Sequence, residues 1–132
     1  MAHQLSSASR NAAADSVEST IGTSPKLYIR TGAQPSDCTQ ADSGSLLATL
    51  TLPSDWLSTS SAGVKNLAGT WSGTATGTGT AGHFRIKDSS GTTCHWQGSI
   101  GLGTGDMPMD NTNIAINQTI NVTSFSLTMG GA

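Results

Sequence analysis

Few residues of this chain have side chains that could take part in catalysis. The sequence of 132 residues contains three histidines, two cysteines, one glutamate and seven aspartates. General acid–base and nucleophilic catalysis both need a base that is held next to an activated partner. Only a few pairs of these residues are predicted to lie close enough together for such a contact.

His83 and His95 form the first of these pairs. They lie on two segments that are predicted to form a hairpin, because residues 89–91 have the composition of a turn. On these strands both histidines point away from the face that carries Phe84 and Trp96, so we expect them to be cross-strand neighbours. Two neighbouring histidines can bind a metal or titrate near neutral pH. No third ligand lies near them in sequence, and surface or interface histidines are the simpler interpretation.

Two other groupings carry weaker signals. Cys94 and His95 are adjacent on a predicted strand, where neighbouring side chains point to opposite faces, so they cannot form a nucleophile–base pair. Asp106 and Asp110 are followed by two asparagines and offer several oxygens, as a calcium loop does. Their spacing differs from that of the EF-hand, and the terminal glutamate is missing. We therefore predict that the chain is not an enzyme and has no metal or cofactor site.

Cys38 and Cys94 are the only two cysteines in the sequence. They are far apart and have no companion Cys or His at short spacing, which does not match a zinc site. Two interpretations stay open. The cysteines are either buried free thiols or the partners of a single disulfide. A disulfide would require an oxidising environment and would stabilise the fold by up to about 4 kcal/mol, mainly through the unfolded state.

The overall composition excludes several classes of partner. Ser and Thr number 38 and Gly 16, whereas Lys, Arg, Asp and Glu together number 14, and the net charge is −2. Six scattered basic residues do not form the cluster that phosphate binding requires, so we predict no nucleic-acid partner. No window approaches 18 apolar residues and the first ten residues do not resemble a signal peptide. We therefore expect no membrane partner and synthesis in the cytoplasm.

The sequence predicts one good helix, over residues 5–21. Apolar residues recur there at spacings of three and four, and Gly22 followed by Pro25 ends the pattern. The apolar stripe is rich in alanine and narrow, so the helix either lies across the sheet domain or packs against a partner. We assign five residues of this stripe to an interface: Leu5, Ala8, Ala12, Val17 and Ile21.

From residue 26 onward apolar and polar residues alternate, as they do in half-buried strands. In the last strand Ile120 and Val122 set one register and Phe125 the other, so a bulge or bend is expected near Ser124. The predicted strands lie at residues 26–30, 46–52, 69–75, 83–88, 92–100, 114–116 and 119–129.

This pattern predicts a mainly β fold with one helix before it. Seven or eight short strands, separated by turns, are typical of an antiparallel β-sandwich or a jelly-roll-like domain. We expect an N-terminal helical arm at residues 1–24 and a sandwich domain at residues 25–132. Trp56, Trp71 and Trp96 are interpreted as core or rim residues. The alternative is that they form the exposed platform of a carbohydrate-binding module.

Five segments of the chain form recognisable sequence patterns, without a catalytic signature: Glu18–Gly22, Leu27–Pro35, Leu46–Pro53, Gly82–Ile86 and Asp110–Ile114. Together these segments resemble a family of short proteins encoded in the genomes of tailed bacteriophages and prophages. The resemblance extends over nearly the whole chain.

This resemblance implies a structural protein of the virion, and the small sandwich fits a capsid decoration or cement protein. Such a protein would associate with itself as a dimer or trimer and would contact the major capsid protein. Its location would be the outer capsid surface of the virion, after assembly in the cytoplasm of the bacterial host. A component of the neck, the tail or a head fibre is the alternative within the same family.

Overall fold

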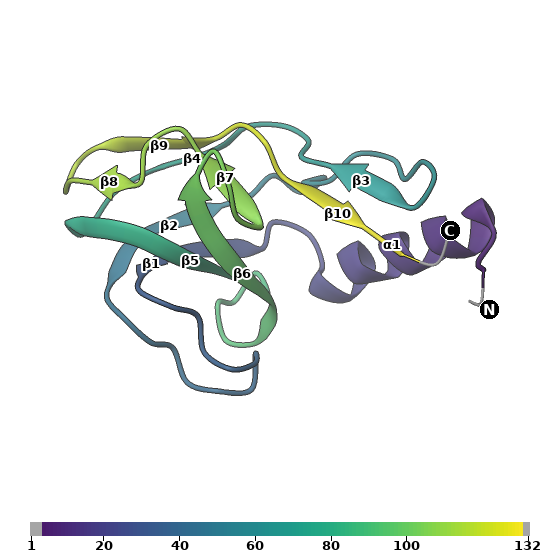
Figure 1. Cartoon of the computed structure of the whole chain (residues 1–132), viewed down its shortest axis with the longest axis horizontal. Helices are drawn as coiled ribbons and strands as arrows, with labels where there is room; N and C mark the ends of the chain where they lie inside the picture. The colour runs from purple at the N-terminus through teal and green to yellow at the C-terminus, as the bar shows by residue number, and fades with distance from the viewer. Residues whose placement is uncertain (1–3, 131–132) are drawn as a thin grey trace.

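The computed structural model describes residues 4–130, and within them the chain forms one helix and ten strands (Figure 1). Residues 1–3 and 131–132, which belong to the predicted arm and domain, lie outside the described residues. The prediction of a mainly β chain that begins with a helix is confirmed. The elements are α1 (Ser7–Ile21), β1 (Lys26–Thr31), β2 (Leu46–Thr51), β3 (Val64–Asn66), β4 (Trp71–Thr74), β5 (Gly79–Lys87), β6 (Cys94–Leu102), β7 (Met107–Met109), β8 (Asn113–Ile114), β9 (Thr119–Val122) and β10 (Ser126–Thr128).

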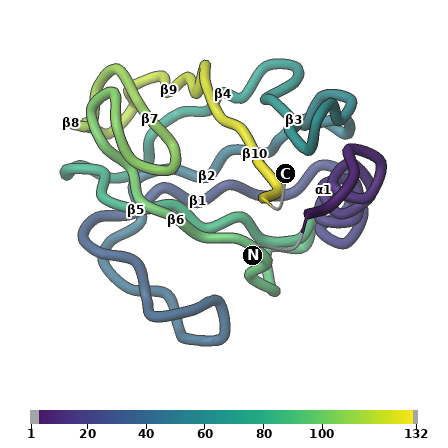
Figure 2. Tube along the Cα trace, turned by 45° about the vertical axis from the view of Figure 1, so that its right-hand side comes forward, coloured from purple at the N-terminus to yellow at the C-terminus, as the bar shows by residue number. Residues whose placement is uncertain are grey.

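Six strands form the main sheet, and four others form two small sheets. The order in the main sheet is β2-β1-β5-β6-β7, and β8 pairs with the beginning of β5. Its pairs are antiparallel except for β6 with β7, which run parallel. β3 pairs with β10, and β4 pairs with β9. Figures 1 and 2 both show β4, β9 and β10 on one side of the main sheet and the connection between β1 and β2 on the other.

Aromatic side chains fill the space between the main sheet and the small sheets. Trp96 lies between Trp56 and Phe125, with ring centroids 6.4 and 4.7 Å away, and Trp71 is 6.0 Å from Trp56. Phe84 from the centre of the main sheet packs edge-on against Phe125 at 5.4 Å. Offset and edge-on arrangements of this kind are the favoured ones for aromatic rings. Trp56 and Trp71 are fully buried, so neither of them offers a ring face to a sugar.

The change of register expected near Ser124 separates two strands that belong to different sheets. β9 places Ile120 and Val122 in the core and pairs with β4, and β10 then pairs with β3. Phe125, between them, is also buried. A single strand cannot bury Val122 and Phe125 together, because their spacing is odd. The chain therefore leaves one sheet at Val122 and enters another at Ser126.

The helix begins two residues later than predicted and lies beside β3 and β10, at one end of the main sheet (Figure 1). Its start is capped by the Ser6 hydroxyl, which accepts a hydrogen bond from the Ser9 amide at 3.1 Å. Its end is set by Gly22, whose φ of 94° suits glycine and whose N–H donates to the Glu18 carbonyl. Ser6 and Gly22 therefore define the two ends of the helix locally.

The face of α1 that docks on the domain differs from the predicted alanine stripe. Leu5 is 49% exposed, and Ala8 and Ala12 are exposed as well. Ile21, by contrast, is a buried residue of the core, and Val17 packs against that core. Three of the five predicted interface residues thus remain on the surface of the chain, and two are used within the domain itself.

Polar contacts also dock α1 on the domain, beside the buried Ala14 and Ile21. The Arg10 guanidinium donates to the Ala62 carbonyl at 2.7 Å, and the Asn11 side-chain oxygen accepts from the Gly63 amide at 2.8 Å. Ala62 and Gly63 form a turn with positive φ values, and this turn leaves backbone groups that side chains must satisfy. Apolar spacing therefore identified only part of the docking face, because it does not reveal polar contacts such as those of Arg10 and Asn11.

Lys65 of β3 makes the central contact with the helix. Its ammonium is buried and lies 2.8 Å from both Asp15 and Glu18. Burial lowers the pKa of Lys65, but the hydrogen bonds to Asp15 and Glu18 outweigh burial, so its pKa lies above the ordinary value. The same contact holds the pKa of Asp15 below its ordinary value. The pair is therefore charged at neutral pH and joins α1 to β3.

Replacing Lys65 by methionine is expected to lower the free energy of unfolding by about 1–3 kcal/mol. Methionine keeps the length of the side chain but leaves Glu18 partly buried without its cation, and half-exposed Asp15 is solvated by water. Urea unfolding followed by tryptophan fluorescence measures the change. Lys26→Met is the control, because Lys26 bonds only to the Thr51 hydroxyl, and it should change stability by about 0.5 kcal/mol or less. An equal loss in both variants would contradict this role of Lys65.

Candidate functional site

A long connection without helix or strand joins β1 to β2 and covers part of the outer face of the main sheet (Figures 1 and 2). We call residues 32–45 the clamped loop. Connections of more than about 12 residues without secondary structure are uncommon in small domains, and they usually have a binding function or are disordered. The clamped loop is held in place by contacts along its whole length, which favours a binding function.

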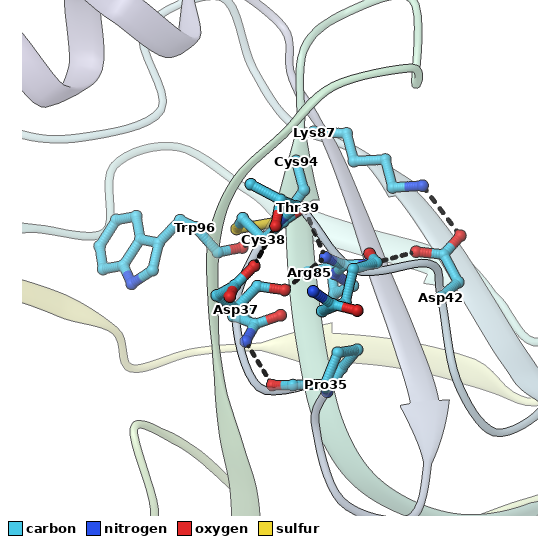
Figure 3. The surroundings of a disulfide bond; sticks show 11 residues. Pro35, Asp37, Cys38, Thr39, Asp42, Arg85, Lys87, Cys94 and Trp96 are labelled. Carbon is cyan, nitrogen blue, oxygen red and sulfur yellow. Dashed lines mark hydrogen bonds and ion pairs between the residues drawn. A yellow bond between two sulfur atoms is a disulfide. The ribbon is translucent and has the colours of Figure 1, made fainter.

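The first of these contacts is covalent. Cys38 in the clamped loop forms a disulfide with Cys94 at the start of β6, and their Cα atoms are 5.2 Å apart (Figure 3). Of the two interpretations that the sequence left open, the structure therefore contains the disulfide. It joins positions separated by 56 residues in the sequence. Oxidation of the two thiols therefore ties the loop to the sheet.

Arg85 of β5 makes the second contact. The side chain is almost completely buried, although it lies on the outer face of the sheet, because the clamped loop covers it. Its guanidinium donates to the Gln40 carbonyl at 3.0 Å and the Asp42 carboxylate at 2.6 Å. It also donates to the carbonyls of Cys38, at 2.9 Å, and Asp37, at 3.4 Å. One side chain thus binds four residues of the loop.

Asp42 of the clamped loop lies close to three cationic side chains of the main sheet. Its carboxylate lies 2.6 Å from Arg85, 2.9 Å from Lys87 and 3.9 Å from Arg30. Burial raises the pKa of Asp42, but the hydrogen bonds from Lys87 and Arg85 outweigh burial and lower it. Figure 3 shows Arg85 and Lys87 both reaching toward Asp42, next to the disulfide. The carboxylate is therefore ionised at neutral pH and links the loop to β1 and β5.

Both ends of the clamped loop are also fixed to the sheet. The Gln97 amide donates to the Pro35 carbonyl at 2.7 Å, and Arg30 donates to the Ser43 carbonyl at 2.8 Å. The Nδ1 atom of His83 lies 2.9 Å from the Gly32 carbonyl, which can only accept, so this nitrogen carries the proton. His83 is fully buried under the loop. Its role in this structure is to hold the loop.

The prediction that His83 and His95 are cross-strand neighbours is wrong. The ladder between β5 and β6 places His83 opposite Ser99 and not opposite His95. Ser99 is four residues beyond His95, and the irregularity between Ile86 and Lys87 shifts the register by only one residue, so the predicted pairing had the two strands in the wrong register. His95 is exposed, whereas His83 is buried. The two histidines therefore do not form a site together.

The predicted acidic loop also serves a local structural role. The Asp106 carboxylate accepts hydrogen bonds from the Ser99 amide at 2.9 Å and the Ser99 hydroxyl at 3.2 Å. The Asn111 side chain accepts from the Asn113 amide at 3.0 Å. Within residues 4–130 no group of three or more His, Cys, Asp and Glu side chains is placed to hold a metal ion.

The outer surface of the clamped loop is exposed and mostly uncharged. Gln34, Ser36, Thr39, Gln40 and Ala41 are all exposed to solvent. A loop that is already fixed loses little conformational entropy when it binds, so more of the contact energy appears as affinity. The arrangement is suited to holding a polar surface in one shape against another protein. Sequence reasoning missed Arg85 and Asp42 as the residues that fix this loop.

Acid should weaken the clamped loop and the neighbouring turn. Hydrogen bonds from the Thr92 amide and the Ser90 hydroxyl lower the pKa of Asp88 to about 2, and contacts with the Thr39 hydroxyl and amide lower the pKa of Asp37. The ordinary value is 3.8. The folded chain therefore binds fewer protons than the unfolded chain below about pH 5.

We accordingly expect the stabilisation from these aspartates to be complete above about pH 5 and to be lost as the pH drops from about 4 to about 2. Urea unfolding at a series of pH values measures the stability, and NMR titration of the aspartate side chains measures the individual pKa values. The stability should fall as Asp37, Asp42 and Asp88 take up protons. A midpoint near 4 for Asp88 would contradict this explanation.

The comparisons with known proteins leave this geometry as the main guide to function. No family model, no curated protein and no solved structure matches the chain. Among the residues that the structure describes, no helix is both long enough and apolar enough to cross a membrane. The clamped loop and the exposed face of α1 are therefore the features from which a function can be argued.

Proposed function

We propose that this chain is a structural protein of a bacteriophage virion, and that it decorates and stabilises the outer head shell as a cement protein does. The sequence resemblance suggests this class. The observation that carries the proposal is a rigid domain with two separate surfaces, the clamped loop and the outer face of α1, both of which can bind other proteins. Figures 1 and 2 show α1 and the clamped loop in different parts of the molecule.

Two separate surfaces are what a bridging protein requires. A subunit that joins two neighbours must contact each of them through a different part of its surface, and each stable contact covers roughly 800 Å² on each partner. The exposed face of α1 carries Ala8 and Ala12, and the exposed Leu5 lies just before the helix. Small alanine side chains allow close approach of another helix, so we assign this face to self-association as a dimer or trimer.

The clamped loop is assigned to contact with the major capsid protein. Its exposed side chains are polar and mostly uncharged, and the loop is held by the disulfide, Arg85 and Asp42. Such a surface can form hydrogen bonds to a shell without rearranging. We also propose that the sheets β3–β10 and β4–β9 act as the second layer of a sandwich, in a jelly-roll-like fold. A two-layer domain around an aromatic core would resist deformation.

Support for an enzyme or a sugar-binding module is weaker. The buried polar side chains Arg85, His83 and Lys65 hold the loop and the helix. The sugar-binding alternative depended on exposed tryptophans, and Trp56 and Trp71 lie in the core. We therefore propose a role in assembly without catalysis.

The copy number in purified particles tests this proposal. Quantitative mass spectrometry should find the chain in intact particles, in a fixed ratio to the major capsid protein that matches the number of capsomers. A low copy number, tied to a single vertex or to the tail, would support the alternative of a neck, tail or head-fibre component. Absence from washed particles would overturn the virion role altogether.

Substitution of glutamate for Ala8 or Ala12 is expected to weaken self-association at least about tenfold, because an unpaired charge in an interface is costly to bury. Both residues are exposed in the chain, so the fold should remain unchanged. Sedimentation equilibrium measures the association. Thr20→Glu is the matched control, since Thr20 is exposed on another side of α1. Equal association of all three variants with the wild type would exclude this face as the contact.

A further inference from the structure

Many contacts of the clamped loop do not depend on the disulfide. Arg85, Lys87, Arg30 and Gln97 bind the loop from β1, β5 and β6, and these strands are neighbours in the main sheet. The contacts lie on both sides of Cys38 in the sequence, from Pro35 to Ser43. A loop that is fixed at so many positions has few alternative conformations, even when Cys38 is still a thiol.

The same contacts bring the two cysteines together. Arg85 donates a hydrogen bond to the backbone carbonyl of Cys38 itself, at 2.9 Å. Lys87, two residues along β5, is the ladder partner of Cys94 and also binds Asp42 of the loop at 2.9 Å. Neighbouring residues of one strand therefore hold both segments that carry the cysteines. Cys38 and Cys94 are both partly exposed, and a small oxidant can therefore reach them.

We propose that the Cys38–Cys94 disulfide closes after the chain has folded, and that Arg85 with Asp42 positions the thiol of Cys38 for this step. The chain then folds with its loop in place while both cysteines are thiols, and the disulfide forms when the folded chain meets an oxidant. The disulfide stabilises a loop conformation that has already formed. This inference holds whether or not the virion role is correct, because it depends on contacts within the chain.

A small-molecule disulfide such as glutathione disulfide serves as the oxidant. The thiolate of one cysteine attacks a sulfur of glutathione disulfide, forms a mixed disulfide and releases one glutathione thiolate. The thiolate of the other cysteine then attacks the protein sulfur of that mixed disulfide and releases the second glutathione. Two electrons pass from the cysteines to glutathione disulfide. The two thiol protons are transferred to the released glutathione or to water.

Oxidation equilibria in glutathione buffers test the proposal. They give the effective concentration of the two protein thiols relative to each other, which is high when the folded chain already holds Cys38 close to Cys94. Wild type, Arg85→Lys, Asp42→Asn and Lys26→Met are compared. We expect Arg85→Lys and Asp42→Asn to lower the effective concentration at least about tenfold, since each loosens the loop that presents Cys38. Lys26→Met should leave it unchanged, because the Lys26 ammonium donates to the Thr51 hydroxyl of β2 and not to the loop. If Arg85→Lys does not fold, Asp42→Asn decides.

Hydrogen exchange of the reduced wild type supplies the second measurement. The amides of Thr39 and Gln40, which donate to Asp37 within the loop, should exchange at similar rates in the reduced and the oxidised protein, and the NMR spectra of β1, β5 and β6 should match. A reduced protein in which these two amides exchange much faster than in the oxidised protein would overturn the proposal, because the disulfide would then create the loop structure. Equal effective concentrations in all four proteins would also overturn it.

Discussion

Arg85→Met is expected to lower the free energy of unfolding by about 3–5 kcal/mol, which is the usual cost of removing one partner from a buried ion pair. The side chain is 1% exposed, and its guanidinium satisfies three backbone carbonyls and the Asp42 carboxylate. Methionine fills a similar space but donates no hydrogen bond. The loop must then either leave these acceptors without partners or open to water.

Urea unfolding measures this loss, and a double-mutant cycle separates the ion pair from the rest. Asp42→Leu alone should cost less than Arg85→Met, because Asp42 is partly exposed and Arg85 keeps its three backbone carbonyl acceptors without it. The double variant should be more stable than the sum of the single losses predicts, by about 1–3 kcal/mol. A loss below about 1 kcal/mol for Arg85→Met would show that the clamped loop is held mainly by other contacts.

Removal of the disulfide by Cys38→Ser together with Cys94→Ser is expected to cost about 4 kcal/mol and to lower Tm by about 10–20 °C. The bond joins positions 56 residues apart, and the cost follows from the freedom that the unfolded chain regains. The protein should remain folded at 25 °C, because Arg85 and Asp42 still hold the loop. Calorimetry and urea unfolding measure both quantities.

Reduction of the wild type provides the matched control for this variant. A dithiol reductant should produce the same loss of stability as the double serine substitution, since both remove only the covalent bond. A double variant that is unfolded at 25 °C would contradict the importance assigned to the non-covalent contacts. A change in Tm of less than about 3 °C would contradict the predicted contribution of the disulfide itself.

Local patterns in the sequence were sufficient for the helix and for most of the strands. Alternation of Leu27 and Ile29 with polar residues predicted β1, and Gly22 with Pro25 predicted the end of α1. These signals act within a few residues, so they do not depend on the rest of the fold. The register conflict around Ser124 similarly predicted a break, and the structure has β9 and β10 there in separate sheets.

The site could not be predicted in the same way, because its contacts join distant parts of the sequence. Arg85 alternates with Phe84 and Ile86, a pattern that predicts an exposed side chain, and only the clamped loop makes it buried. Lys65 becomes buried for a similar reason, when Asp15 and Glu18 of the helix reach it. Charged side chains are buried when they are paired, and the pairing partner is not visible in a local pattern.

The docking face of the helix shows the same limit. Of the predicted apolar stripe, Val17 and Ile21 pack on the domain, whereas Ala8 and Ala12 stay exposed. The domain also binds α1 through the polar residues Arg10, Asn11 and Glu18, which apolar spacing does not reveal. Burial of Ile21 and the hydrogen bond from the Trp56 indole to the Gly22 carbonyl further connect the helix to the core. The helix α1 thus packs on the sheets, and its outer face remains exposed.

Cryo-electron microscopy of purified particles tests the proposed virion role, since it locates the chain and shows which of its surfaces touch neighbours. The proposed function predicts density for this fold on the outer head shell, repeated with the symmetry of the capsomers. The clamped loop should face the major capsid protein, and the Ala8 side of α1 should face another copy of the chain. Density only at the neck, tail or a single vertex, or none at all, would contradict the claim.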